Sequence, residues 1–180
     1  MNDIYSLLKS LKKEKKKNWN ISWNLCMFLT NLIEINKPKR VLEIGTSNGF
    51  STLCLLKNLP LTSKIYTIEI NNTRFEEAKQ NFLKYSKNIF QIKGNVFEIL
   101  KDKKKLNEKF DLIFIDAAQD RYKEILLLIE KRCILNKNSL IIFDNILTHK
   151  STKSLFDLVK KKYIYELIEI DSGFLILKND

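Results

Sequence analysis

The sequence is poor in glycine, proline, cysteine and histidine. Its 180 residues include four glycines, two prolines, three cysteines and one histidine. No Pro-, Gly- or Ser-rich linker divides the chain, so we expect a single domain over residues 1–180, of which residues 1–37 form a helical extension. The three cysteines, Cys26, Cys54 and Cys133, are far apart and include no CxxC pair. This pattern favours neither a disulfide framework nor a zinc site, and it predicts a cytoplasmic protein in a reducing compartment.

Long apolar runs are also missing. The stretch 21–35 is interrupted by Asn24, Thr30, Asn31 and Glu34, which make it too polar to span a bilayer. The amino terminus places its basic cluster after its apolar residues, unlike a signal peptide. We therefore expect a soluble protein without a membrane partner.

Arginine is scarce, although the net charge is +11. Lysine, isoleucine and asparagine are abundant and share A- and T-rich codons, so the excess of lysine fits a biased genome as well as an anionic partner. The charge permits nucleic acid binding without indicating it. The densest cluster, KKEKKK at 12–17, fits either a solvated helix end or a surface that contacts phosphates.

Short apolar runs rich in β-formers alternate with longer amphipathic stretches. The stretch 74–85, for example, repeats apolar residues at spacings of three and four, which predicts a helix. Strand followed by helix, repeated about five times, predicts an α/β fold with a doubly wound parallel sheet covered on both faces. The expected strands lie at 40–44, 64–70, 89–93, 110–115 and 140–143.

Both ends of the chain depart from this alternation. Two β runs, 165–170 and 174–178, are separated by Asp171, Ser172 and Gly173, which predicts a tight hairpin and an antiparallel last strand. Before the first strand, two helices are expected at about 4–16 and 21–35.

Ligands of open α/β sheets bind beyond the carboxyl ends of the strands. The first strand leads into Gly45 and Gly49, which permit positive φ and a close approach of a ligand to the backbone. Their spacing departs from GxGxxG, so a dinucleotide phosphate cradle is disfavoured. Ser51 and Thr52 could cap the helix that follows.

The next two strands end in residues suited to a nucleoside. Glu69 could accept hydrogen bonds from ribose hydroxyls, and Asn95 could pair with an adenine edge. Each also has an ordinary explanation, because Glu69 could be a solvated residue and Gly94-Asn95 a turn or helix cap. The glycine loop beside them favours the nucleoside.

Acidic and amide side chains follow the fourth and fifth strands. Asp116 ends one, and Asp144 and Asn145 end the other. Their oxygens are the hard donors that Mg²⁺ prefers, so the sequence predicts a divalent metal site, although an isolated Asp-Asn pair is usually a turn.

These residues resemble the class I S-adenosylmethionine-dependent methyltransferases, and within them the metal-dependent, catechol O-methyltransferase-like O-methyltransferases. The resemblance covers residues 21–178. The matching segments are VLEIGTSNGFS (41–51), YTIEI (66–70), GNVFEIL (94–100), FDLIFIDAAQDRY (110–122) and LIIFDNIL (140–147).

The resemblance implies a Rossmann-like seven-stranded sheet whose last strand is antiparallel. It implies that the cofactor is S-adenosylmethionine, with Glu69 on the ribose and Asn95 and Val96 beside the adenine. The methionine part would be bound by Glu43, Gly45, Ser47, Gly49 and Ser51, together with Asp116. The divalent metal, with Mg²⁺ expected, would be held by Asp116, Asp144 and Asn145, and Asp116 would be the catalytic residue.

Two features depart from the family. Members with catechol-like substrates commonly carry a general-base lysine where this chain has Gln119, which cannot take a proton at neutral pH. The segment between Asn145 and the last hairpin is also short, so the site should be open. His149 is expected in an exposed loop, although it lies close enough in sequence to approach the site.

The leading interpretation is an O-methyltransferase acting on a small aromatic or catechol-like hydroxyl. The alternatives are an RNA (tRNA hydroxyuridine-type) O-methyltransferase and a catalytically silent cofactor-binding module, and a nicotinamide-dependent dehydrogenase is the weakest option. Family members are often homodimers, so a homodimer is possible here too. Trp19 and Trp23 are expected to be packing residues, with a substrate-facing wall as the alternative.

Overall fold

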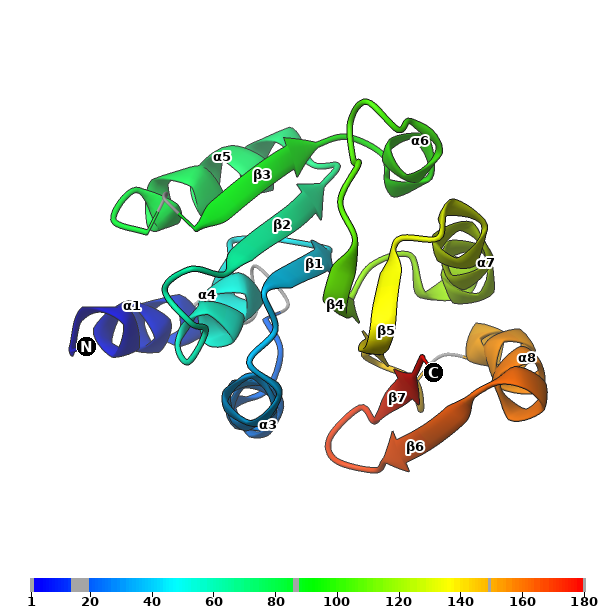
Figure 1. The fold of residues 1–180 in the computed structure, drawn as a ribbon. Coiled ribbons are helices and arrows are strands. Elements are labelled where there is room, and N and C mark those ends of the chain that lie inside the picture. Colours follow the sequence, from blue (N-terminus) through cyan, green and yellow to red (C-terminus); the bar gives the residue numbers. More distant parts are fainter. Residues whose placement is uncertain (1, 14–19, 86–87, 149, 180) are drawn as a thin grey trace.

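The fold is built on one mixed sheet of seven strands, seen in a computed structural model that describes residues 2–13, 20–85, 88–148 and 150–179 (Figure 1). The strand order is β3-β2-β1-β4-β5-β7-β6. The strands are β1 (Arg40–Ile44), β2 (Lys64–Glu69), β3 (Ile89–Lys93), β4 (Phe110–Ile115), β5 (Leu135–Phe143), β6 (Ile164–Ile168) and β7 (Phe174–Lys178). The expected Rossmann-like, doubly wound α/β architecture is confirmed.

The first five strands are parallel, and β1 and β4 lie at the centre of the sheet. All four residues of β1 after Arg40 are buried, as are five of the six residues of β4. Apolar side chains on both faces are expected for strands that helices cover on both sides. Strand order reverses between β1 and β4, and this is the position at which such sheets bind ligands.

The last strand is antiparallel to both of its neighbours, as predicted. β7 inserts between β5 and β6, so β6 forms the edge of the sheet. The predicted three-residue hairpin is wrong in its length, because Ile168 pairs with Phe174 and five residues, 169–173, form the connection. This register leaves residues 169 and 170 unpaired, and Asp171 and Gly173 turn the chain with positive φ.

Helices cover both faces of the sheet (Figure 1). One face carries α1, α3, α4 and α5, and the other carries α6, α7 and α8, as the two clusters of buried apolar residues show. The helices are α1 (Asn2–Lys13), α3 (Trp23–Asn36), α4 (Phe50–Leu56), α5 (Asn72–Phe82), α6 (Val96–Lys101), α7 (Tyr122–Arg132) and α8 (Lys153–Lys162), with short 3₁₀ turns at Gln119–Arg121 and Lys150–Thr152.

The two predicted amino-terminal helices are present. Ser22 caps α3 by accepting a hydrogen bond from the N–H of Leu25, and Lys37 ends the helix in a left-handed conformation just before Pro38. Trp23 packs edge-on against Phe50 of α4, with ring centroids 5.6 Å apart, which fits its packing interpretation. Trp19, residues 14–17 of the basic cluster and His149 lie outside the described residues.

Cys26 and Cys54 form a disulfide, contrary to the expectation from the sequence. They are 28 residues apart in the chain and carry no spacing motif, but α3 lies against α4 and brings their Cα atoms to 5.5 Å. Both are buried, whereas Cys133 is a free, exposed thiol. The missing signal was helix packing, which cysteine spacing does not report.

None of the described helices is long and apolar enough to cross a bilayer. The treatment of residues 1–37 as an extension of one domain stays a prediction.

Candidate functional site

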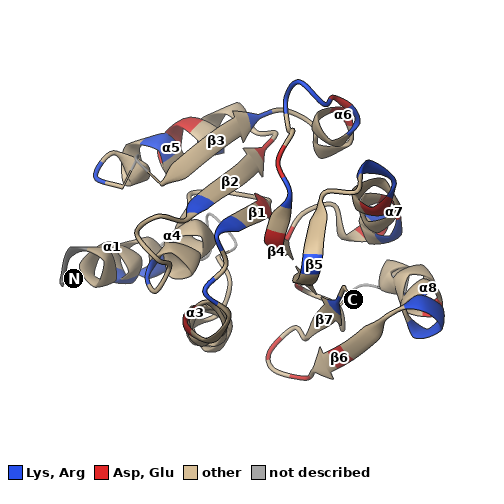
Figure 2. Ribbon diagram, viewed as in Figure 1, with Lys and Arg blue, Asp and Glu red and all other residues tan. Residues whose placement is uncertain are grey.

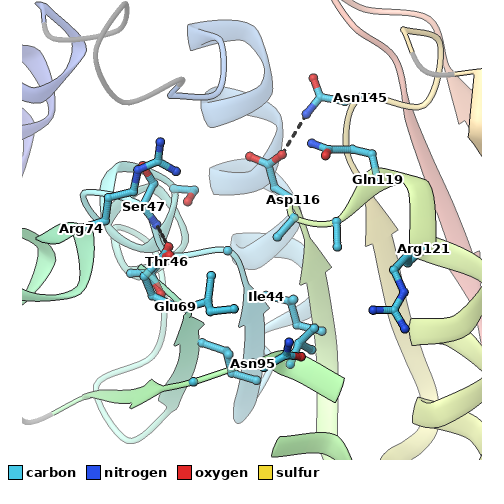
Figure 3. Close-up of a pocket in the computed structure, with 18 of the residues that line it drawn as sticks. Ile44, Thr46, Ser47, Glu69, Arg74, Asn95, Asp116, Gln119, Arg121 and Asn145 are labelled. Atoms are coloured by element: carbon cyan, nitrogen blue, oxygen red, sulfur yellow. Dashed lines mark hydrogen bonds between the residues drawn. The ribbon is translucent and has the colours of Figure 1, made fainter. Parts of the chain in front are cut away.

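A cavity of about 640 Å³ opens beyond the carboxyl ends of β1, β2, β3 and β4. It lies where the sheet topology places a ligand (Figure 3). The residues predicted for the site that line this cavity are Gly45, Ser47, Ser51, Glu69, Asn95, Val96, Asp116 and Asn145. Glu43, Gly49 and Asp144 do not line it.

The loop after β1 needs its glycines for geometric reasons. Gly45 has φ +105°, and a Cβ there would lie 2.5 Å from the backbone oxygen of Asp116. Gly49 has φ +89° and caps α4, and a Cβ there would lie 2.4 Å from the ring of Phe82. The loop therefore packs too closely against its neighbours for any larger residue.

Glu43 lies beneath this loop and is fully buried. Its carboxylate accepts hydrogen bonds from the hydroxyls of Ser51 and Thr67, both at 2.5 Å, and from Thr52. Burial raises the pKa of Glu43 to about 7, although these three hydroxyls oppose the rise. Ser51 and Thr52 do not provide the helix cap that their sequence position allowed, because both hydroxyls donate to the buried acid instead.

Glu69 holds the same loop from the end of β2. Its Oε2 accepts the N–H of Ser47 at 2.8 Å (Figure 3), and its Oε1 accepts the N–H of Asn71 at 2.8 Å. The residue is 6% exposed and lines the cavity. Both carboxylate oxygens are thus held by the backbone, so the orientation of Glu69 toward the cavity is fixed, and each oxygen keeps capacity for another donor.

Asn95 fits both interpretations that the sequence left open, a helix cap and a residue of the ligand site. Its Oδ1 caps α6 by accepting the N–H of Phe97 at 2.9 Å. The residue also lines the cavity together with Val96 and Phe97. The cap fixes the side chain, and its amide nitrogen has no hydrogen-bond acceptor among the described residues.

An acidic cluster stands at the other end of the cavity. Asn145 donates from Nδ2 to Asp116 Oδ1 at 2.8 Å and to Asp144 Oδ2 at 3.2 Å. Asp144 Oδ1 also accepts the N–H of Asn145 at 2.7 Å and the hydroxyl of Ser172 at 3.5 Å. The strand ends thus bring the three predicted metal ligands together.

These carboxyls are costly to ionise. Burial, followed by the charges of Asp144 and Glu43, raises the pKa of Asp116 well above its usual value. Burial raises the pKa of Asp144 to about 6, although the N–H of Asn145 opposes this rise. Among the described residues no three His, Cys, Asp or Glu side chains gather as a metal site, so any such site would depend on the amide of Asn145.

Sequence reasoning missed several residues that line the cavity. Asn20 and Ile21 precede α3 and line the cavity. The side chain of Asn20 donates to the carbonyl of Leu11 at 2.9 Å, which ties this segment to α1. Arg74 and Arg121 also line it. The tertiary packing of the amino-terminal segment left no local pattern in the sequence, whereas Arg121 stood within a recognised motif and could have been singled out.

The positive charge is spread over the molecule. Figure 2 shows Lys and Arg on α1, α5, α7, α8 and the α6–β4 connection. Of the described cations, Arg74 and Arg121 line the cavity. Within the part of the chain that the structure describes, the charge distribution does not single out a nucleic acid surface at the site.

The comparisons with known proteins agree with this architecture. Residues 3–173 match the model of a family described as O-methyltransferase. Caffeoyl-CoA O-methyltransferase 2 of Petunia hybrida is 30% identical over 168 residues, which is 87% of this chain and 68% of that protein. Catechol O-methyltransferase of Sus scrofa is 26% identical over 120 residues, which is 64% of each protein.

A solved structure shares the fold. The O-methyltransferase from Bacillus cereus in complex with SAH has a TM-score of 0.87 at 20% identity, over 97% of this chain and 91% of that one. The chain spans about half the length of two further curated relatives, both O-methyltransferases from Aspergillus species.

Proposed function

Because the chain belongs to the O-methyltransferase family, we propose that it transfers a methyl group from S-adenosylmethionine to a hydroxyl of a small aromatic or catechol-like acceptor. The observation that carries this proposal is the arrangement of the cavity. Glu69 and Asn95 stand on one side and Asp116 with Asn145 on the other, so a nucleoside and an acceptor can lie in one continuous space.

The cofactor would be held along the ends of β1, β2 and β3. Glu69, fixed by two backbone N–H groups, is suited to accept the two ribose hydroxyls. Asn95 and Val96 would border the adenine. The methionine part would lie along the loop of Gly45, Ser47 and Ser51, where the glycine lets a ligand approach the backbone.

Glu43 and Gly49 would act indirectly. Neither lines the cavity, but Glu43 fixes the hydroxyls of Ser51 and Thr52, and Gly49 starts the helix that carries them. We therefore propose that both residues shape the methionine subsite without contacting the cofactor.

A divalent cation fits the acidic end of the cavity by the chemistry of its donors. Asp116, Asp144 and Asn145 carry the hard oxygens that Mg²⁺ prefers, and the Asn145 amide, which now points Nδ2 at both acids, would turn to present its oxygen. Asp144 is 3% exposed and does not line the cavity, so it would need to be reached from the side of Asp116. A bound divalent cation would lower the pKa of the acceptor hydroxyl.

The protein residues would then orient the reaction. With the acceptor hydroxyl held next to the methyl group of the donor, the hydroxyl oxygen would attack the methyl carbon as the bond from carbon to sulfur breaks. The hydroxyl proton leaves to solvent, and S-adenosylhomocysteine is the other product. Gly45 of the proposed methionine subsite packs closely against the backbone of Asp116, which supports a role for Asp116 beside both donor and acceptor.

Gln119 favours a second candidate function. It lines the cavity at the position of the family's general-base lysine, and glutamine cannot take a proton. A silent module would bind the cofactor without turning over any hydroxylated acceptor. An RNA acceptor is the other alternative, and the spread of lysines does not favour it.

The decisive experiment is calorimetry with S-adenosylhomocysteine in magnesium and in EDTA, followed by catechol or tRNA as second ligand. We expect cofactor binding in both buffers and catechol binding in magnesium. A radiolabelled methyl-transfer assay on both acceptors follows. Cofactor binding without product on either acceptor would favour the silent module, and no cofactor binding in either buffer would contradict the methyltransferase proposal.

A further inference from the structure

Arg121 packs face-on against Phe97 at the Asn95 end of the cavity. The central carbon of its guanidinium lies 3.5 Å from the ring centroid, and both residues line the cavity. Arg121 follows β4 in a 3₁₀ turn, and Phe97 stands in the first turn of α6, which follows β3. The contact therefore joins the loops of two strands that are not neighbours in the sheet.

Glu124 fixes the orientation of this guanidinium. Its carboxylate accepts Arg121 Nε at 3.2 Å and Nη2 at 2.6 Å, one helical turn away. The side chains of Arg121 and Glu124 are 43% and 56% exposed, so the ion pair adds little to folding stability. What the pair does provide is a planar cation held in one position beside the cavity, with Nη1 free of acceptors among the described residues.

The residues around the guanidinium plane of Arg121 suit a flat, nitrogen-rich ring. Val96, Phe97 and Ala118 are apolar residues that line the cavity here. Asn95 and Arg121 offer N–H donors to the same part of the cavity (Figure 3). Adenine has a large apolar face and acceptor nitrogens at its edge, and guanidinium groups interact well with both.

We propose that Arg121, set in place by Phe97 and Glu124, binds the adenine ring of the cofactor and contributes to the choice of a purine nucleoside. This inference rests on the proposed function, because it presupposes that a nucleoside cofactor occupies the cavity. It assigns a binding role to Arg121 and positioning roles to Phe97 and Glu124.

The test compares ligands that contain the adenine ring with a ligand that lacks it. Affinities for S-adenosylhomocysteine, adenosine and L-methionine are measured by calorimetry on the full chain, with Arg121→Ala, Arg121→Lys and the control Lys123→Ala, an exposed residue outside the cavity. We expect Arg121→Ala to weaken S-adenosylhomocysteine and adenosine by about tenfold and to leave methionine unchanged. Arg121→Lys keeps the positive charge but removes the planar guanidinium group. It should therefore also weaken the binding of S-adenosylhomocysteine and adenosine.

A double-mutant cycle tests the positioning roles. If Phe97 acts by holding Arg121, then Phe97→Leu and Arg121→Ala combined should lose less affinity than the sum of the separate losses. Thermal unfolding of each variant without ligand identifies losses that come from misfolding.

Three results would overturn the inference while wild-type binding persists: unchanged adenosine affinity in Arg121→Ala, an equal loss for methionine, or full affinity in Arg121→Lys. Wild-type protein that fails to bind S-adenosylhomocysteine would contradict the proposed function itself, which is a separate outcome.

Discussion

The side-chain amide of Asn145 donates a hydrogen bond to the carboxylate of Asp116, with nitrogen and oxygen 2.8 Å apart. The two residues end neighbouring parallel strands and are 29 positions apart in the sequence. Asn145 has a left-handed φ of 58°, a conformation that asparagine tolerates better than most residues. One amide thus bridges two neighbouring carboxyls that otherwise repel each other.

The first prediction is that magnesium stabilises the wild-type protein through this cluster. A cation that binds only the folded state at a concentration of 100 times its Kd adds about 2.7 kcal/mol of stability. That should raise Tm by about 5–10 °C in a chain of this size, measured by thermal scans at neutral pH with magnesium and with EDTA. Asp144→Asn should lose most of the shift, whereas Asp120→Asn, at an exposed position, should keep it. An equal shift in both variants would place the cation elsewhere.

The second prediction concerns the pH dependence of stability through Glu43. Its pKa in the folded protein, about 7, exceeds the ordinary value of 4.5, so the folded state holds the proton more tightly than the unfolded state. The resulting stabilisation is complete below pH 4.5 and is lost as the pH rises to 7. The loss amounts to about 3 kcal/mol.

Glu43→Gln should remove this contribution, so that its free energy of unfolding falls less steeply from pH 4.5 to 7 than that of the wild type. Urea unfolding at several pH values measures the slope. Glu98→Gln, which changes an exposed carboxylate, serves as the control. Parallel wild-type and Glu43→Gln curves would show that Glu43 does not titrate in this window.

The sequence predicted most of the fold because the strands are short, apolar and regularly spaced. It placed β1, β3 and β4 at their observed bounds, and it began β2 correctly. It missed the first residues of β5, because Asn136, Lys137 and Asn138 are polar at the solvent-facing start of that strand. Local hydropathy reports burial, whereas residues 136–138 are not fully buried and lie between the pairs Phe110–Leu135 and Leu112–Leu140, where the register shifts.

For the site, sequence reasoning found the strand-end residues but not what they contact. Parallel strands bring their carboxyl ends to one edge, so Glu69, Asn95 and Asp116 could be expected together. The burial of Glu43 away from the cavity and the approach of Asn20 depend on how helices pack in three dimensions. No periodicity in the chain encodes that packing.

The third prediction is that the Cys26–Cys54 disulfide stabilises the protein. A crosslink closing a loop of this length contributes about 3 kcal/mol, mainly by restricting the unfolded chain. Reduction, or the paired change Cys26→Ala and Cys54→Ala, should lower Tm by about 6–12 °C. Cys133→Ala should not, because that thiol is free and exposed. In denaturant, thiol titration should find one reactive group before reduction and three after it, and three before reduction would contradict the bond.

The fourth prediction separates two glycines by the space around them. Gly45→Ala places a Cβ 2.5 Å from the backbone oxygen of Asp116, an atom that cannot move without displacing β4. Gly94→Ala meets the side-chain end of Ile99 at 3.3 Å, which can yield, although its φ of +146° is also strained.

We expect Gly45→Ala to abolish S-adenosylhomocysteine binding and to reduce stability by more than about 2 kcal/mol, and Gly94→Ala to be milder in both respects. Calorimetry and urea unfolding measure the two effects. Similar losses in the two variants would show that backbone strain, and not the contact with Asp116, decides the outcome.

The insertion of β7 between β5 and β6 determines the order in which the sheet can be assembled. β6 precedes β7 in the chain, yet it has no partner until residues 174–178 pair with β5. As the chain leaves the ribosome, the β5 edge therefore stays open, with its backbone groups unpaired, after everything that forms the cavity walls has been made. Such an edge is a ready template for another chain. The interval before β7 arrives is therefore a time when the β5 edge can pair with another chain, and slow synthesis of residues 164–178 would lengthen it.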